Sequence, residues 1–130
     1  MVATAIAAVA TLGACGADGD AFTPTREYAI GLRAEERGDG YGYVAEDALD
    51  LRVGDRVTFE MRNDGDLIHD LVVVHPDGRA IATGPAIAAG ASLDLVVDFV
   101  DAGIYRLNCN VDDHLTVYGM QELVQVAEAS

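Results

Sequence analysis

Short apolar segments of alternating polarity limit what this chain can fold into. In residues 56–62 (RVTFEMR), Val57, Phe59 and Met61 alternate with polar side chains. A period of two places these three residues on one face of a half-buried strand. Similar segments recur between turn residues, and no stretch keeps a helical period over a useful length. We therefore predict an all-β fold, an antiparallel two-sheet Greek-key β-sandwich of about seven or eight strands.

Turn residues divide the apolar segments into the expected strands. These strands are residues 26–33, 49–53, 56–62, 68–75, 93–99, 104–109 and 120–126. Residues 34–47 are polar and rich in glycine, so we expect a long surface loop there. His75 precedes Pro76 in a turn, and we expect it to be exposed to solvent.

The composition indicates one folded domain, which we place at residues 26–130. A chain of 130 residues that is 51% hydrophobic has room for a single core. Its net charge of −14, from 22 acidic and 8 basic residues, argues against nucleic acids and anionic membrane surfaces as partners. The same charge would attract a protein with a basic docking surface. We expect the domain to be a monomer.

Residues 1–25 are expected to be a signal segment followed by a short tether. Residues 1–14 are uncharged and mostly small or apolar, and this run is too short to cross a membrane. It ends in Leu-Gly-Ala-Cys15, which resembles the lipobox of bacterial lipoproteins. That resemblance implies that Cys15 is lipidated and that the protein is exported to the periplasmic or extracellular face of the membrane. The alternative is an unstructured N-terminus.

The segment CNVDDHLTVYGM, residues 109–120, carries three candidate metal ligands. Cys109, His114 and Met120 offer a thiol, an imidazole and a thioether, and His69 offers a second imidazole. Two His, one Cys and a distant Met form the donor set of blue-copper electron-transfer sites. Cys109, Met120 and His69 lie at the ends of predicted strands, and His114 lies in the loop between two of them, so the four side chains can meet at one end of the sandwich. We predict a single bound copper ion.

Each of these residues also has a simpler interpretation when it is taken alone. A lone cysteine is more often a small core residue than a ligand, and His69 could be a core histidine. The order His, Cys, His, Met along the chain favours the metal site over those interpretations. Met61 alternates with Val57 and Phe59, so we expect it in the core rather than at the metal.

This pattern resembles the cupredoxins, the plastocyanin and azurin type of blue copper protein. The similarity covers about residues 26–128 and rests on the Cys, His and Gly-Met cluster with its upstream His. It implies that His69, Cys109 and His114 are equatorial copper ligands and that Met120 is the axial ligand. It further implies a carrier that passes single electrons between redox partners and is not an enzyme.

The chain departs from the family pattern in three places. Five residues separate His114 from Met120, more than is common in the family, so Gln121 is the alternative axial ligand. Asp70 stands where an Asn often follows the first His, which changes the hydrogen bonding that holds the Cys loop. Asn108 and Asn110 flank the Cys where multicopper oxidases carry histidines, so a trinuclear oxygen-reducing centre is excluded.

Two other functions remain open on the sequence. One is a copper carrier or storage module, which would release the ion to a recipient. The other is a binding domain that has kept the sandwich without the metal.

Overall fold

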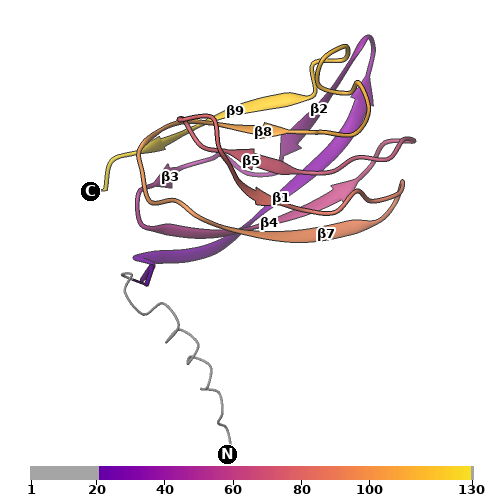
Figure 1. Ribbon diagram of the computed structural model, residues 1–130. Coiled ribbons are helices and arrows are strands. Elements are labelled where there is room, and N and C mark those ends of the chain that lie inside the picture. Colours follow the sequence, from indigo (N-terminus) through magenta and orange to yellow (C-terminus); the bar gives the residue numbers. More distant parts are fainter. Residues whose placement is uncertain (1–20, 130) are drawn as a thin grey trace, which may run out of the picture.

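The computed structural model describes residues 21–129, which form a sandwich of two β-sheets (Figure 1). Its nine strands are β1 (Arg26–Arg37), β2 (Gly40–Ala45), β3 (Leu51–Arg52), β4 (Asp55–Asn63), β5 (Val72–Val74), β6 (Ala80–Thr83), β7 (Ser92–Asp98), β8 (Gly103–Asn108) and β9 (Gln121–Ala127). One sheet has the order β2-β1-β4-β7, and the other has the order β3-β9-β8-β5-β6.

The N-terminal prediction falls outside the described part of the chain. Residues 1–20, which include the proposed signal segment and Cys15, are not described. Within residues 21–129, no helix is long and apolar enough to cross a membrane.

The predicted all-β sandwich is confirmed, with two corrections to its strands. The described residues hold nine strands, and neither β2 nor β6 was expected. The sheets are also not purely antiparallel, because β1 pairs with β4 and β3 pairs with β9 in parallel. Parallel neighbours cannot be joined by a tight hairpin. The chain therefore passes through β2 and β3 between β1 and β4.

Residues 34–47 form most of a hairpin rather than the predicted long loop. β1 continues to Arg37, which pairs with Gly40 at the start of β2. The turn between them is tight, and Gly38 has a φ of 51°, in the left-handed region that glycine adopts easily. The prediction was wrong because polarity was taken as a sign of a loop, whereas only one face of this hairpin is buried.

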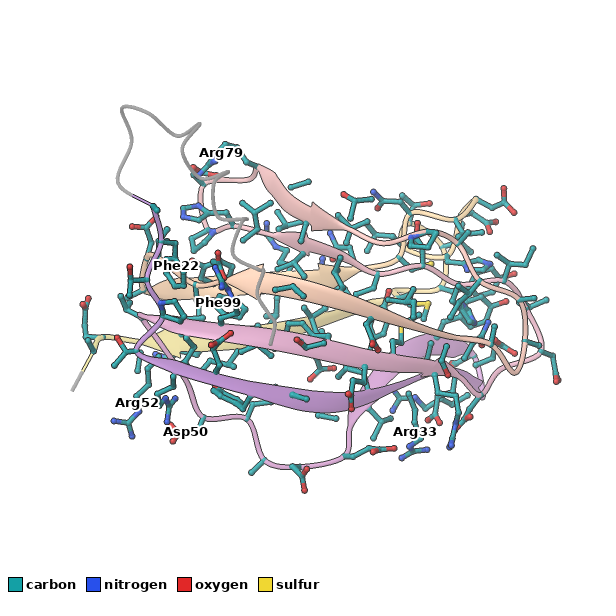
Figure 2. The ribbon with its side chains drawn as sticks, turned by 90° about the horizontal axis from the view of Figure 1, so that it is seen from below. Phe22, Arg33, Asp50, Arg52, Arg79 and Phe99 are labelled. Atoms are coloured by element: carbon teal, nitrogen blue, oxygen red, sulfur yellow. The ribbon has the colours of Figure 1, made fainter. Side chains whose placement is uncertain are left out.

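The alternating segments place their apolar side chains between the sheets, as predicted. Val57, Phe59 and Met61 are fully buried. Tyr105, Leu107 and Cys109 are fully buried as well, so β8 carries its cysteine on the core side. Figure 2 shows charged side chains such as Arg33, Asp50 and Arg52 directed away from the sheets.

His75 is buried, contrary to the expectation that it faces solvent. Only 8% of it is exposed. Its Nε2 lies 2.7 Å from Oδ2 of Asp101, and its Nδ1 accepts a hydrogen bond from the backbone N–H of Asp77. With both ring nitrogens satisfied, the imidazole can pack edge-on against Tyr105 at the end of β8 remote from Cys109.

A buried carboxylate fastens β1 to β4. Asp55 is 1% exposed and accepts hydrogen bonds from Nε and Nη2 of Arg26, both at 2.7 Å. It also accepts hydrogen bonds from Tyr28 Oη and from the backbone N–H of Arg52. Burial by itself raises the pKa of Asp55, but these hydrogen bonds and the charge of Arg26 outweigh burial and hold that pKa below its ordinary value.

We expect Asp55→Asn to lower the free energy of unfolding by about 2 kcal/mol at neutral pH, because an amide cannot accept from all of these donors. A depressed carboxyl pKa stabilises the fold above the ordinary carboxyl pKa, and this stabilisation disappears as the pH falls through the folded-state pKa. The difference from the wild type should therefore shrink in acid. Urea unfolding measures it, with the exposed Asp94→Asn as control. Equal stability of the two variants at neutral pH would contradict the assignment.

Candidate metal centre

His69, Cys109 and His114 meet at one end of the sandwich. Sγ of Cys109 lies 4.0 Å from Nδ1 of His69 and 3.6 Å from Nδ1 of His114. One donor atom from each of the three residues lies within 4.8 Å of the other two. The tertiary structure therefore brings together three of the four predicted ligands, although His69 and Cys109 are 40 residues apart in the chain.

The three donors are spaced so that they can share one ion. Metal bonds of about 2.3 Å to sulfur and 2.0 Å to nitrogen, at trigonal angles, place sulfur and nitrogen roughly 3.7 Å apart. The two observed separations lie on either side of that value. One thiolate with two imidazoles suits copper or zinc.

The metal-free site holds its cysteine as a thiol. Burial is the largest influence on Cys109, and it raises the pKa of the thiol above its ordinary value. A metal that binds the thiolate must displace this proton. The positive charge of the metal ion lowers the pKa of the Cys109 thiol, which the protein alone does not do.

Backbone hydrogen bonds set the positions of the three ligands. Cys109 follows β8, and its N–H donates to the carbonyl of Met120, whose own N–H donates to the carbonyl of His114. His69 forms an isolated β-bridge with Ile87, with hydrogen bonds in both directions. The predicted strand over residues 68–75 is thus shorter than expected, because the regular pairing of β5 begins only at Val72.

The structure is similar to those of solved copper proteins. Auracyanin from the photosynthetic bacterium Roseiflexus castenholzii matches with a TM-score of 0.59 and 18% identity, over 80% of this chain and 98% of auracyanin. Auracyanin A, a "blue" copper protein from Chloroflexus aurantiacus, matches with a TM-score of 0.57 and 16% identity, over 75% of this chain and 98% of that protein.

The chain has the cupredoxin fold. By sequence, it matches no protein-family model and no curated protein. A copper-containing nitrite reductase from Thermus scotoductus also contains this fold, with a TM-score of 0.55 and 16% identity over 81% of this chain. The match covers only 28% of the reductase. At such identities the likeness shows the fold, and the function has to be argued from the site.

Within this cupredoxin fold, Met120 rather than Gln121 is buried on the side of Cys109. Met120 is fully buried and belongs to the same apolar cluster as Cys109. Gln121 begins β9, is exposed, and donates a hydrogen bond from Nε2 to Oδ1 of Asn108. Neighbouring residues of an extended chain point to opposite sides. The arrangement favours Met120 as the fourth donor.

Asp70 holds the segment that follows the cysteine. Its Oδ1 accepts a hydrogen bond of 2.8 Å from the backbone N–H of Asn110. Its carbonyl accepts a hydrogen bond from Tyr43 Oη at 2.6 Å. Burial is the largest influence on Tyr43, and it raises the pKa of this phenol, which therefore stays protonated. Asp70 therefore holds the cysteine loop by a hydrogen bond, and unlike an Asn at this position it also places a carboxylate near the thiol.

Three residues near the ligands were missed in the sequence. The first is Glu36, whose Oε2 lies 2.5 Å from Nε2 of His69. The second is Tyr41, which packs edge-on against the rings of His69 and His114. The third is Tyr118, whose ring stacks on that of Tyr41 with centroids 4.2 Å apart. All belong to the β1–β2 hairpin or to the loop that it contacts, where Tyr41 N–H donates to the Tyr118 carbonyl.

A pattern that would have found Glu36 is present in the sequence. Ile30, Leu32 and Ala34 are buried at every second position of β1. The same alternation places Glu36 on the inner side of the strand. Interpreting residues 34–47 as a loop removed this residue from consideration.

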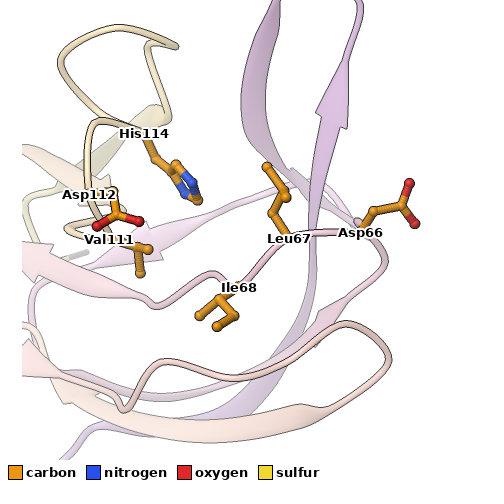
Figure 3. A pocket seen from close by; sticks show the side chains of 6 residues that line it. All are labelled: Asp66, Leu67, Ile68, Val111, Asp112 and His114. Atoms are coloured by element: carbon orange, nitrogen blue, oxygen red, sulfur yellow. The ribbon is translucent and has the colours of Figure 1, made fainter.

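A hollow of about 280 Å³ opens beside His114 (Figure 3). Its lining residues are Asp66, Leu67, Ile68, Val111, Asp112 and His114. Leu67 and Ile68 are 42% and 52% exposed. His114 retains 6% exposure, whereas His69 and Cys109 are fully buried. The ring of His114 is therefore the ligand through which the centre reaches the surface.

Proposed function

We propose that this protein binds one copper ion through His69, Cys109 and His114, with Met120 as the axial ligand, and carries single electrons outside the cytoplasm. The observation that carries the proposal is the convergence of one buried thiol and two imidazoles at one end of a cupredoxin fold. Bound copper supplies a one-electron couple between Cu(II) and Cu(I). The protein side of this function is to hold the donors still.

The preformed site supports electron transfer over copper delivery. The backbone of His69 is held by Ile87, and that of Cys109 is held by Met120. A rigid donor set that is already assembled needs little rearrangement when the charge of the ion changes. Burial of His69 and Cys109 also restricts exchange of the ion with solvent, which a copper carrier would require.

Bond-making chemistry is not part of the proposal. Asn108 and Asn110 flank the cysteine, and neither offers the imidazole that an oxygen-reducing copper cluster would take from these positions. The Asn108 side chain accepts a hydrogen bond from Gln121, and the backbone N–H of Asn110 donates one to Asp70.

The hollow beside His114 supports docking of a basic redox protein. Leu67, Ile68 and Val111 offer apolar contact next to the exposed edge of a ligand, and Asp66 and Asp112 place negative charge at the rim. The net charge of −14 would steer a cationic partner toward the molecule. Export and lipid attachment at Cys15 stay predictions.

Loading the metal-free protein with Cu(II) should give one ion per chain and an intense blue colour from thiolate-to-copper charge transfer. Cys109→Ser should abolish this colour because it removes the thiolate, while circular dichroism remains that of the wild type. A pale site with rapidly exchanging copper would favour a carrier. Absence of stoichiometric uptake would indicate a metal-free binding domain.

Met120→Leu should retain copper and raise the reduction potential, because loss of a thioether donor removes a ligand that stabilises Cu(II). Gln121→Leu is the matched control, since that side chain is exposed on the other side of the chain. Voltammetry of both variants measures the effect. A shifted potential in Gln121→Leu with none in Met120→Leu would assign the axial position to Gln121.

Neutralising the rim with Asp66→Asn and Asp112→Asn should slow electron transfer to a small cationic oxidant, such as a cobalt ammine complex, severalfold at low ionic strength. The control double variant is Glu60→Gln with Asp94→Asn, which removes equal charge from paired, exposed positions of β4 and β7 that do not line the hollow. Stopped-flow rates at low and high salt measure the effect. Equal rates in the two double variants would reject docking at the hollow.

A further inference from the structure

The imidazole of His69 is hydrogen-bonded to a carboxylate on a strand distant in sequence. Oε2 of Glu36 lies 2.5 Å from Nε2 of His69, and the two residues are 33 positions apart. His69 is fully buried, so water does not compete for this ring nitrogen. A carboxylate accepts hydrogen bonds only, so Nε2 carries the proton. The unprotonated Nδ1 is then the nitrogen that faces Sγ of Cys109, at 4.0 Å.

The carboxylate is itself held in place from its other side. Oε1 of Glu36 accepts a hydrogen bond of 2.7 Å from the backbone N–H of Asp66. The neighbouring Asp64 N–H donates to the carbonyl of Ala34 on β1. The loop that precedes His69 is thus tied to the strand that carries Glu36. A glutamine at position 36 could not keep both hydrogen bonds in this arrangement, because its amide offers an acceptor oxygen on one side and a donor NH2 on the other.

The loop also leaves space for this carboxylate. A Cβ on residue 65 would overlap Oε2 of Glu36. Gly65 is not among the residues with positive φ, so alanine is compatible with its backbone. Alanine at this position would therefore displace the carboxylate from His69 without removing its charge.

We propose that Glu36 is a positioning residue that selects the tautomer of His69 and, as an extension of the proposed copper function, favours the oxidised ion. A hydrogen bond from an imidazole ligand to a carboxylate makes the metal-binding nitrogen a stronger donor. The negative charge acts in the same direction, because it favours the ion of higher charge. Transfer of one electron to Cu(II) becomes less favourable, and the reduction potential is lowered.

The first experiment measures the potentials of copper-loaded Glu36→Gln and Gly65→Ala. In Glu36→Gln, we expect the affinity for Cu(II) relative to Cu(I) to fall about tenfold, which raises the potential by about 59 mV for one electron. Gly65→Ala should shift the potential in the same direction by a smaller amount. It keeps the charge, so it remains informative if the glutamine variant folds poorly.

The control is Glu35→Gln. Glu35 lies on the same strand with its side chain 24% exposed, and it pairs with Arg33 and Arg37 rather than with the metal ligands. The Glu35→Gln substitution removes the same charge as Glu36→Gln, and the reduction potential of this control variant should match that of the wild type. If Glu36→Gln and Glu35→Gln have equal potentials in protein that is blue, the tuning role of Glu36 is overturned.

The second experiment does not need copper. In the metal-free protein, ¹⁵N NMR should show His69 with its proton on Nε2 and a slowly exchanging ring N–H, and Glu36→Ala should lose that slow exchange. A proton on Nδ1 in the wild type would overturn the positioning role. If the wild type took up no copper, the proposed function would fail, but this measurement would still decide whether Glu36 sets the tautomer.

Discussion

The backbone ladder between β8 and β9 is the constraint on which the centre depends. Asn108 pairs with Gln121 at its last step, and the next hydrogen bond runs from Cys109 N–H to the Met120 carbonyl. This closure brings the backbones of Cys109 and Met120 side by side at the two ends of the loop. His114 returns toward the same point because its carbonyl accepts from Met120 N–H. Main-chain hydrogen bonds thus position Cys109, His114 and Met120 relative to one another.

The second half of the centre comes from the middle of the sequence, 40 residues before Cys109, and is positioned differently. His69 lies outside the regular strands and is held by a single β-bridge to Ile87. Its side chain is fixed by Glu36 on one side and faces Cys109 on the other. The β1–β2 hairpin provides that carboxylate and also Tyr41, which covers both imidazoles. The hairpin is therefore part of the wall of the centre as well as an edge of the sheet.

The two ends of the molecule differ in what surrounds their histidines. At one end, His75 is hydrogen-bonded to Asp77 and Asp101 and belongs to no cluster of three metal-binding side chains among the described residues. At the other end, the hollow beside His114 combines apolar walls with two carboxylates. Within residues 21–129, this second end alone combines a candidate metal site with a ligand side chain that reaches the surface.

The sequence by itself determined the fold class, the core positions and the four candidate ligands. Period-two alternation is a local property, and burial follows directly from it, as Val57, Phe59 and Met61 show. The parallel pairing of β1 with β4, the burial of His75 and the contact of Glu36 with His69 were decided only by the tertiary structure. Each depends on which distant segments lie side by side, and the polarity of one segment contains no information about its neighbour.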